Sequence, residues 1–178
     1  SAEITATPFV RFLKIVSLGA SRIRQTPLAW FLPPKIRSKA RFQSITALAA
    51  WTHQMLDFLG GSGRAEAGTD VHLARTSFAG LATLRPFLTG FCQVAARCEE
   101  IQHVLKTHGL NQATYGTATK ILEQLPDTSL VKARLAAWFE KHISLHRALG
   151  IGEISLLVSS DIIESLFGKF KTIIQRNP

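Results

Sequence analysis

Apolar residues recur at the spacing of an α-helix along most of this 178-residue chain, and a few glycines and prolines interrupt them. The pattern predicts a helix over residues 8–24, closed by Leu32-Pro33-Pro34, and a second helix whose first turn holds Pro34 and which reaches Leu59. Gly60-Gly61-Ser62-Gly63 ends that second helix and opens an exposed loop. These features favour a mainly α fold, a helical bundle.

The middle of the chain predicts two more helical stretches. One begins near Asp70, is broken or kinked at Pro86, and continues to Gly109, a residue suited to a helix C-terminus. A short helix follows over residues 112–125.

The last part of the chain departs from this pattern. Asp127 can cap a helix that reaches Leu149, and the short apolar run at residues 154–158 suits a buried strand. We therefore expect at most one or two short strands, near the C-terminus. We also expect a helical domain over residues 1–150, with a strand and a helix over residues 151–178.

Positive charge is concentrated at the N-terminal end. The chain has 21 basic and 12 acidic residues, a net charge of +9, and residues 1–41 alone contribute +7. Clustered cations attract polyanions, most often nucleic acid, through phosphate neutralisation and counterion release. A solvated basic face without a partner and a surface facing an anionic membrane are the alternatives. The basic residues of this region are Arg11, Lys14, Arg22, Arg24, Lys35, Arg37, Lys39 and Arg41.

Composition excludes several classes of protein. No run of eighteen apolar residues is present, so we expect no membrane-spanning helix. Two cysteines cannot make a disulfide scaffold, and Cys92 and Cys98 lie six residues apart on a predicted helix, where they would not meet. A reducing compartment, the cytoplasm, is the simplest interpretation. The chain begins at Ser1 without a leader pattern, so we expect a processed protein or an excerpt of a longer one.

Histidines and tryptophans lie on the predicted helices. His142 and His146 are four residues apart, a spacing that lets two imidazoles bind one metal ion, but no third ligand stands out and both lie on or beside an apolar stripe. Trp51 and Trp138 are predicted core residues. The stripe consists of Val131, Leu135, Trp138, Phe139, Leu145 and Leu149.

The C-terminal residues predict one more helix, which begins at Ser159-Ser160-Asp161 and reaches Gln175. Glu164, Gly168, Lys171 and Gln175 fall within about 60° on one face of it. An acid, an open position and a lysine in line suit a site where a metal ion and a phosphate backbone meet. The alternative for Glu164 is structural, because it is also placed to form a capping box with the start of the helix.

Residues 160–171, SDIIESLFGKFK, resemble the end of the catalytic domain of bacterial DDE transposases, which belong to the RNase H-like superfamily of retroviral integrases. In that superfamily the last of three metal-binding acids lies on a helix after the core sheet, and a basic residue commonly follows it by seven positions, as Lys171 follows Glu164. Several branches insert a helical domain before that acid, so the resemblance implies that residues 1–150 are an insertion-like domain. The resemblance implies that Glu164 is catalytic and binds Mg²⁺ or Mn²⁺, while Lys169 and Lys171 contact DNA.

The chain also departs from the family, which needs two further aspartates at or just beyond core strands. Asp57, Asp70 and Asp127 all lie in predicted helices or caps. The resemblance therefore implies the C-terminal part of a transposase, without the N-terminal strands of the catalytic domain and inactive alone, with no metal tightly bound. Its partner would be DNA at transposon ends, and a homo-oligomer is compatible with it. The alternative is a non-enzymatic, all-helical DNA-binding or protein-interaction domain.

Trp30 lies between prolines and near the basic cluster, so we expect it to be partly exposed. Beside Arg24 and Lys35, an exposed indole suits stacking on a base, and helical insertions of transposases use aromatic side chains in this way on a flipped base. The alternative is that Trp30 packs over the Pro33-Pro34 turn. The candidate DNA-binding residues are Arg22, Arg24, Trp30, Lys35, Arg37, Lys169 and Lys171.

Overall fold

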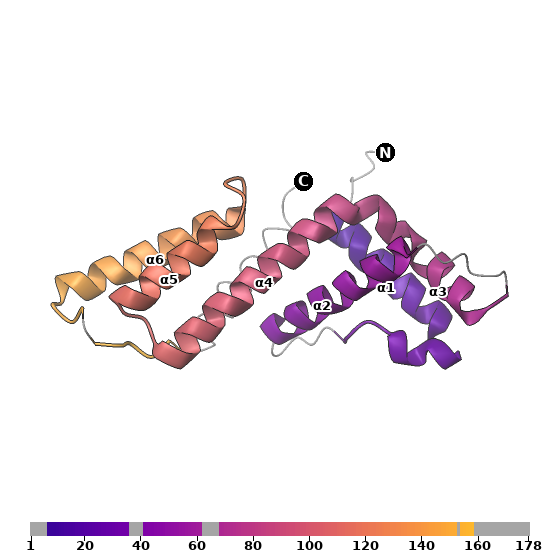
Figure 1. The fold of residues 1–178 in the computed structure, drawn as a ribbon, viewed down its shortest axis with the longest axis horizontal. Helices are drawn as coiled ribbons and strands as arrows, with labels where there is room; N and C mark the ends of the chain where they lie inside the picture. The colour runs from indigo at the N-terminus through magenta and orange to yellow at the C-terminus, as the bar shows by residue number, and fades with distance from the viewer. Residues whose placement is uncertain (1–6, 36–40, 62–67, 153, 159–178) are drawn as a thin grey trace, which may run out of the picture. The chain divides into compact units, whose positions relative to one another are not determined.

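The computed structural model describes residues 7–35, 41–61, 68–152 and 154–158. Within these ranges the chain forms six α-helices and two 3₁₀ helices, with no strand longer than an isolated bridge (Figure 1). The expectation of a mainly α fold is confirmed. In chain order the elements are α1 (Pro8–Ile23), η1 (Pro27–Phe31), α2 (Arg41–Gly60), α3 (Asp70–Phe78), η2 (Ala79–Leu84), α4 (Arg85–His108), α5 (Gln112–Glu123) and α6 (Leu130–Ala148).

Local capping chemistry explains where several helices begin and end. The Thr7 hydroxyl accepts a hydrogen bond from the backbone N–H of Val10, and Pro8 occupies the first position of α1. At α5, Asn111 and Thr114 form a reciprocal capping box. Gly109, after α4, has φ +70°, which confirms its predicted role at a helix C-terminus.

The connection between α1 and α2 differs from the prediction. Residues 32–35 are not helical and α2 begins at Arg41, so the prediction that Pro34 lies in the first turn of the second helix is wrong. The 3₁₀ helix η1 was not predicted; the Thr26 hydroxyl caps it by accepting from the N–H of Leu28. At five residues, η1 is too short to show a periodic pattern.

The interruption of the third helical stretch is present, but it lies before Pro86. The chain leaves the α-helical conformation after Phe78 and resumes it at Arg85, with η2 between. Pro86 therefore lies in the first turn of α4, where its missing N–H costs no intrahelical hydrogen bond.

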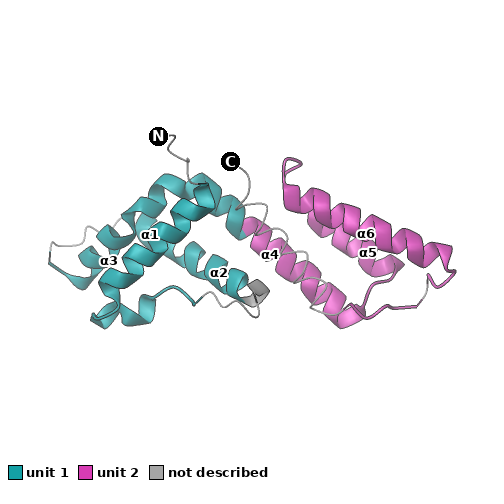
Figure 2. Cartoon of the chain, turned by 180° about the vertical axis from the view of Figure 1, so that it is seen from behind, with its two compact units in different colours: residues 1–92, 171–178 teal, residues 93–170 magenta. Residues whose placement is uncertain are grey.

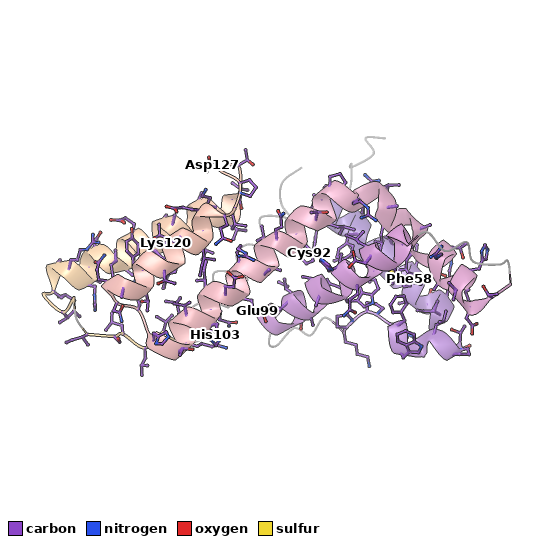
Figure 3. All side chains as sticks on the ribbon, viewed as in Figure 1. Phe58, Cys92, Glu99, His103, Lys120 and Asp127 are labelled. Atoms are coloured by element: carbon purple, nitrogen blue, oxygen red, sulfur yellow. The ribbon has the colours of Figure 1, made fainter. Side chains whose placement is uncertain are left out.

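The N-terminus of α6 corrects a second prediction. The Ser129 hydroxyl, not Asp127, caps the helix by accepting from the backbone N–H of Lys132 at 3.3 Å. Asp127 lies in the turn between α5 and α6 (Figure 3), where it accepts a 2.6 Å hydrogen bond from Nζ of Lys132. The lysine holds the pKa of Asp127 below its ordinary value, through the hydrogen bond first and then through its charge.

The apolar run at residues 154–158 is not a buried strand. Leu110 and Leu156 form an isolated antiparallel bridge, with N–H···O distances of 2.7 and 3.0 Å. Leu157 is 92% exposed and Ile154 is 56% exposed. A short apolar run does not reveal whether other elements cover it, which is why the prediction of burial is wrong.

The chain forms two compact units, and their boundary falls within α4, between Cys92 and Gln93 (Figure 2). Unit 1 contains α1 to α3 and the start of α4, and unit 2 contains the rest of α4 with α5 and α6. This boundary lies inside the stretch 1–150 that we expected to form one domain. Most of the expected second domain, residues 159–178, lies outside the described residues.

The core of unit 1 is rich in aromatic rings. Trp51 is 7% exposed, as predicted, and meets Phe78 edge to face at a centroid distance of 5.4 Å. The ring of Phe12, on α1, contacts the ring of Phe91 at a centroid distance of 5.9 Å. At Gly19 of α1, an added Cβ would lie 2.3–2.9 Å from the ring of Phe78, so a glycine is needed where α1 and α3 pack.

In unit 2, α5 and α6 pack side by side (Figure 1) and bury aliphatic residues around Phe139. The predicted apolar stripe of α6 is only partly buried. Trp138 is half-buried rather than in the core, and Leu145 and Leu149 are 56% and 62% exposed. The buried residues of α6 are Val131, Leu135, Phe139, Ile143 and His146.

Candidate nucleic-acid interface

The outer face of α1 carries exposed basic side chains. Phe12, Val16 and Ile23 turn into the core of unit 1. Since a helix turns about 100° per residue, the opposite side of α1 faces solvent. We call the exposed residues on that side the α1 surface: Val10, Arg11, Lys14, Ser17, Leu18, Ser21 and Arg22.

The cations of the α1 surface lack local neutralisation. The helix contains no Asp or Glu. Within the described residues, Arg11, Lys14 and Arg22 take part in none of the ion pairs, which join His53 to Asp57, Arg97 to Glu100 and Lys132 to Asp127. Adjacent like charges without counter-charges create a positive potential that a polyanion lowers. This arrangement fits phosphate binding.

Two more predicted contacts continue the basic surface along the chain. Arg24 is the exposed C-cap residue of α1, and Lys35 is exposed after η1. The remaining predicted DNA contacts, Arg37, Lys169 and Lys171, lie outside the described residues, as does the predicted metal ligand Glu164. Their roles stay predictions.

Trp30 is the most exposed tryptophan, with 78% of its surface accessible, which confirms the expectation of partial exposure. Its ring contacts Phe31 at a centroid distance of 5.2 Å, and Phe31 meets Phe58 edge to face, also at 5.2 Å. The indole N–H of Trp51 donates to the Phe31 carbonyl at 3.0 Å. Phe31 is thus anchored in unit 1, while the neighbouring indole keeps most of its surface open for stacking.

The positions of the two α6 histidines fit packing. His146 is 1% exposed, and neither ring nitrogen has a hydrogen-bond partner. The ring of His142 contacts that of Trp138 at a centroid distance of 4.5 Å, tilted by 44°, and burial, followed by the charge of Lys141, lowers the pKa of His142. Within the part of the chain that the structure describes, no three His, Cys, Asp or Glu side chains are grouped to hold a metal ion.

Both cysteines are free thiols, as predicted. The Cys92 thiol donates to the Ala49 carbonyl at 3.4 Å, and burial raises its pKa to about 11. Burial raises the pKa of Cys98 to about 12. Because the thiolate is the reactive species, neither side chain suits nucleophilic chemistry at neutral pH.

A polar cluster between α5 and α6 escaped the sequence analysis. The Tyr115 hydroxyl donates to Oε2 of Glu140 at 2.8 Å, and the Ser144 hydroxyl donates to Oε1 at 3.1 Å. Nε of Arg147 donates to Gln112 at 2.9 Å. Tyr115 and Glu140 are 25 residues apart, so no local pattern could reveal the contact. The cluster joins two helices and serves the fold.

No protein-family model matches the chain, and neither a curated protein nor a solved structure matches it. Among the helices that the structure describes, none has both the length and the apolar character needed to cross a bilayer.

Proposed function

We propose that unit 1 binds nucleic acid, specifically DNA, through the α1 surface and the basic residues that follow it. The observation that carries the proposal is the set of exposed, unpaired cations on a helix without acidic residues. Such cations displace condensed counterions from phosphates, which supplies most of the affinity for DNA irrespective of its sequence.

Trp30 adds a second kind of contact. Its exposed indole offers a flat apolar face on which an unpaired base can stack, an interaction of about 1–3 kcal/mol per base. We expect Trp30→Ala to weaken binding of single-stranded DNA about tenfold and to change duplex binding little. Equal losses for both substrates would argue against stacking.

The main test compares two variants of equal net charge. In the first, Arg22, Arg24, Lys35 and Arg37 are all replaced by Gln. The slope of log K against log salt concentration is negative, and each lost phosphate contact should reduce its magnitude by about 1 for every DNA sequence. An unchanged slope would show that the region is a solvated face. The matched control replaces four exposed cations of unit 2, which should leave the slope unchanged: Lys106, Lys120, Arg134 and Lys141.

We propose further that the chain serves as part of a DNA transposase catalytic region, with a helical insertion followed by the last metal-binding acid. The resemblance of residues 160–171 to DDE transposases supports this proposal. Metal-dependent DNA strand cleavage and transfer would then belong to the intact protein, with Mg²⁺ or Mn²⁺ held partly by Glu164. The alternative, a non-enzymatic helical DNA-binding domain, shares the DNA contacts but not the chemistry.

Glu164→Gln separates these two functions. Glutamine keeps a capping box but lacks the charge that a hard divalent cation requires. In a chain completed with the strands that bear the first two aspartates, this change should abolish metal-dependent cleavage and preserve folding and DNA binding. Lys171→Ala should weaken engagement of the DNA end without removing metal binding. Full cleavage by the Glu164→Gln variant would leave the capping box as the only role of Glu164.

A further inference from the structure

The shape of the α1 surface suits one particular form of DNA. α1 has sixteen residues, and its exposed side chains extend from Val10 to Arg22, so its outer face is open along most of its length. A helix with its side chains is about 10–12 Å wide, which matches the major groove of B-form DNA at about 12 Å and exceeds the minor groove at about 6 Å. Only the major groove admits such a helix.

The order of residues on this face suits a helix that lies along the groove. Arg11 and Arg22 stand eleven residues apart, or about 16 Å along the helix axis, and differ by only about 20° around it, so both project from one flank of the helix. Long cations on that flank can reach phosphates along one side of the groove. Lys14, Leu18 and Ser21 lie between them and are exposed.

We propose, on the basis of the proposed function, that α1 is a recognition helix that lies in the major groove of duplex DNA. Arg11 and Arg22 contact phosphates along one side of the groove, and Lys14 and Ser21 face the base edges. Leu18, which is 52% exposed, contacts the C5-methyl groups of thymine, the one apolar group that the major groove presents.

Two other occupants fit this face less well. Single-stranded DNA needs aromatic platforms, and the α1 surface has none, because Phe12 is buried and Phe9 packs against Phe91. A membrane-bound amphipathic helix inserts its apolar face into the lipid, whereas that face of α1 lies in the core of unit 1. Among the large apolar side chains of α1, Val10 and Leu18 are exposed, at 41% and 52%.

The first experiment asks which groove is occupied. The full chain, bound to an A·T-rich 20-base-pair duplex, is titrated with methyl green, which occupies the major groove, and with netropsin, which occupies the minor groove. We expect methyl green to displace the protein and netropsin to leave it bound. Displacement by netropsin alone, or by neither ligand, would overturn the proposal.

The second experiment tests the contact of Leu18. Replacing every thymine of the duplex by uracil removes only the methyl groups, and the loss of one buried methyl contact corresponds to about a fourfold loss of affinity. We expect this loss for the unaltered chain but not for Leu18→Ala. Leu145→Ala, which truncates a similarly exposed leucine of unit 2, should respond as the unaltered chain does.

The outcomes distinguish this inference from the proposed function. If the uracil duplex binds the unaltered chain as tightly as the thymine duplex, α1 does not read the groove as proposed. The proposal that unit 1 binds DNA would still stand if the variant in which Gln replaces Arg22, Arg24, Lys35 and Arg37 loses its salt-dependent affinity. If that variant binds normally, the proposed function itself fails.

Discussion

Unit 1 and unit 2 are both helical, but they use their charged residues in different ways. Residues 1–92 contain eleven basic and four acidic residues, whereas residues 93–170 contain eight of each. In unit 2, Arg97 bonds to Gln124 and pairs with Glu100, and Lys132 binds Asp127. In unit 1 the cations of α1 point outward without such partners. Charge in unit 2 thus supports the fold, and charge in α1 remains available to a ligand.

The two cores differ as well. Unit 1 packs aromatic rings against a helix crossing so close that it requires Gly19. Unit 2 buries mainly aliphatic side chains and reinforces the contact of α5 with α6 through the polar cluster around Glu140. The difference predicts that unit 1 tolerates changes of volume poorly, while unit 2 responds more to changes of polar contacts and pH.

The largest effect is expected for Phe78→Ala, which should lower the free energy of unfolding by about 3–5 kcal/mol because the ring is fully buried. Hydrogen exchange resolved by residue would show the loss of protection in α1 and α3. Protection in α5 and α6 should persist if each unit is stabilised by its own core. Equal losses in both units would break the comparison.

The contact of Gly19 with Phe78 can be tested by a double-mutant cycle. Gly19→Ala alone should cost about 1–3 kcal/mol, since the added methyl group overlaps the ring. In the Phe78→Ala background the same methyl group enters the space left by the ring and should cost less. Strictly additive free energies from urea unfolding would contradict the close contact.

In unit 2, burial rather than sequence spacing should decide the cost of truncation. Ile143 is fully buried, so Ile143→Ala should lower the free energy of unfolding by about 2–5 kcal/mol. Leu145, two residues on, is 56% exposed, and Leu145→Ala should change it by no more than about 0.5 kcal/mol. A large loss for Leu145→Ala in the monomeric chain would mean that another element covers it.

The cap of α6 offers a smaller effect. Ser129→Ala removes the side-chain bond to the Lys132 N–H and should cost about 1 kcal/mol. Asp127→Ala, which leaves that cap in place, should cost less. The reverse order in thermal unfolding would restore Asp127 as the cap.

The smallest effect concerns pH. Hydrogen bonds from Tyr115 and Ser144 lower the pKa of Glu140 below its ordinary 4.5. These bonds therefore stabilise the folded chain above about pH 4.5, and the stabilisation is lost as the pH falls through the lowered pKa of Glu140. The hydrogen bond to Glu140 raises the pKa of Tyr115 above its ordinary 10. The contribution of this bond to folding stability is therefore present below pH 10 and is lost as the pH rises through the raised pKa of Tyr115. Tyr115→Phe should therefore destabilise slightly between about pH 5 and pH 9 and less outside this range. A constant difference in urea unfolding across pH would contradict this.

Local chemistry made much of the helical pattern predictable. The start of α1, the positive φ of Gly109 and the helix over residues 112–123 follow from side chains within a few positions of each end. The basic character of the N-terminal region follows directly from the sequence, and the exposure of Trp30 was expected from the prolines and cations that flank it. The predicted roles of Glu164 and Lys171 still rest on sequence alone.

The amino-acid sequence by itself determined that this chain is helical, where most helices end and that its positive charge gathers near the N-terminus. Only the tertiary structure decided which faces are covered. Periodicity shows that Leu145 and Ile143 lie on a helix, but the packing of α5 and the other elements of unit 2 leaves one exposed and buries the other. In the same way, only the burial of Phe12, Val16 and Ile23 in unit 1 turns Arg11, Lys14 and Arg22 outward on one surface, because burial depends on contacts between residues far apart in the chain.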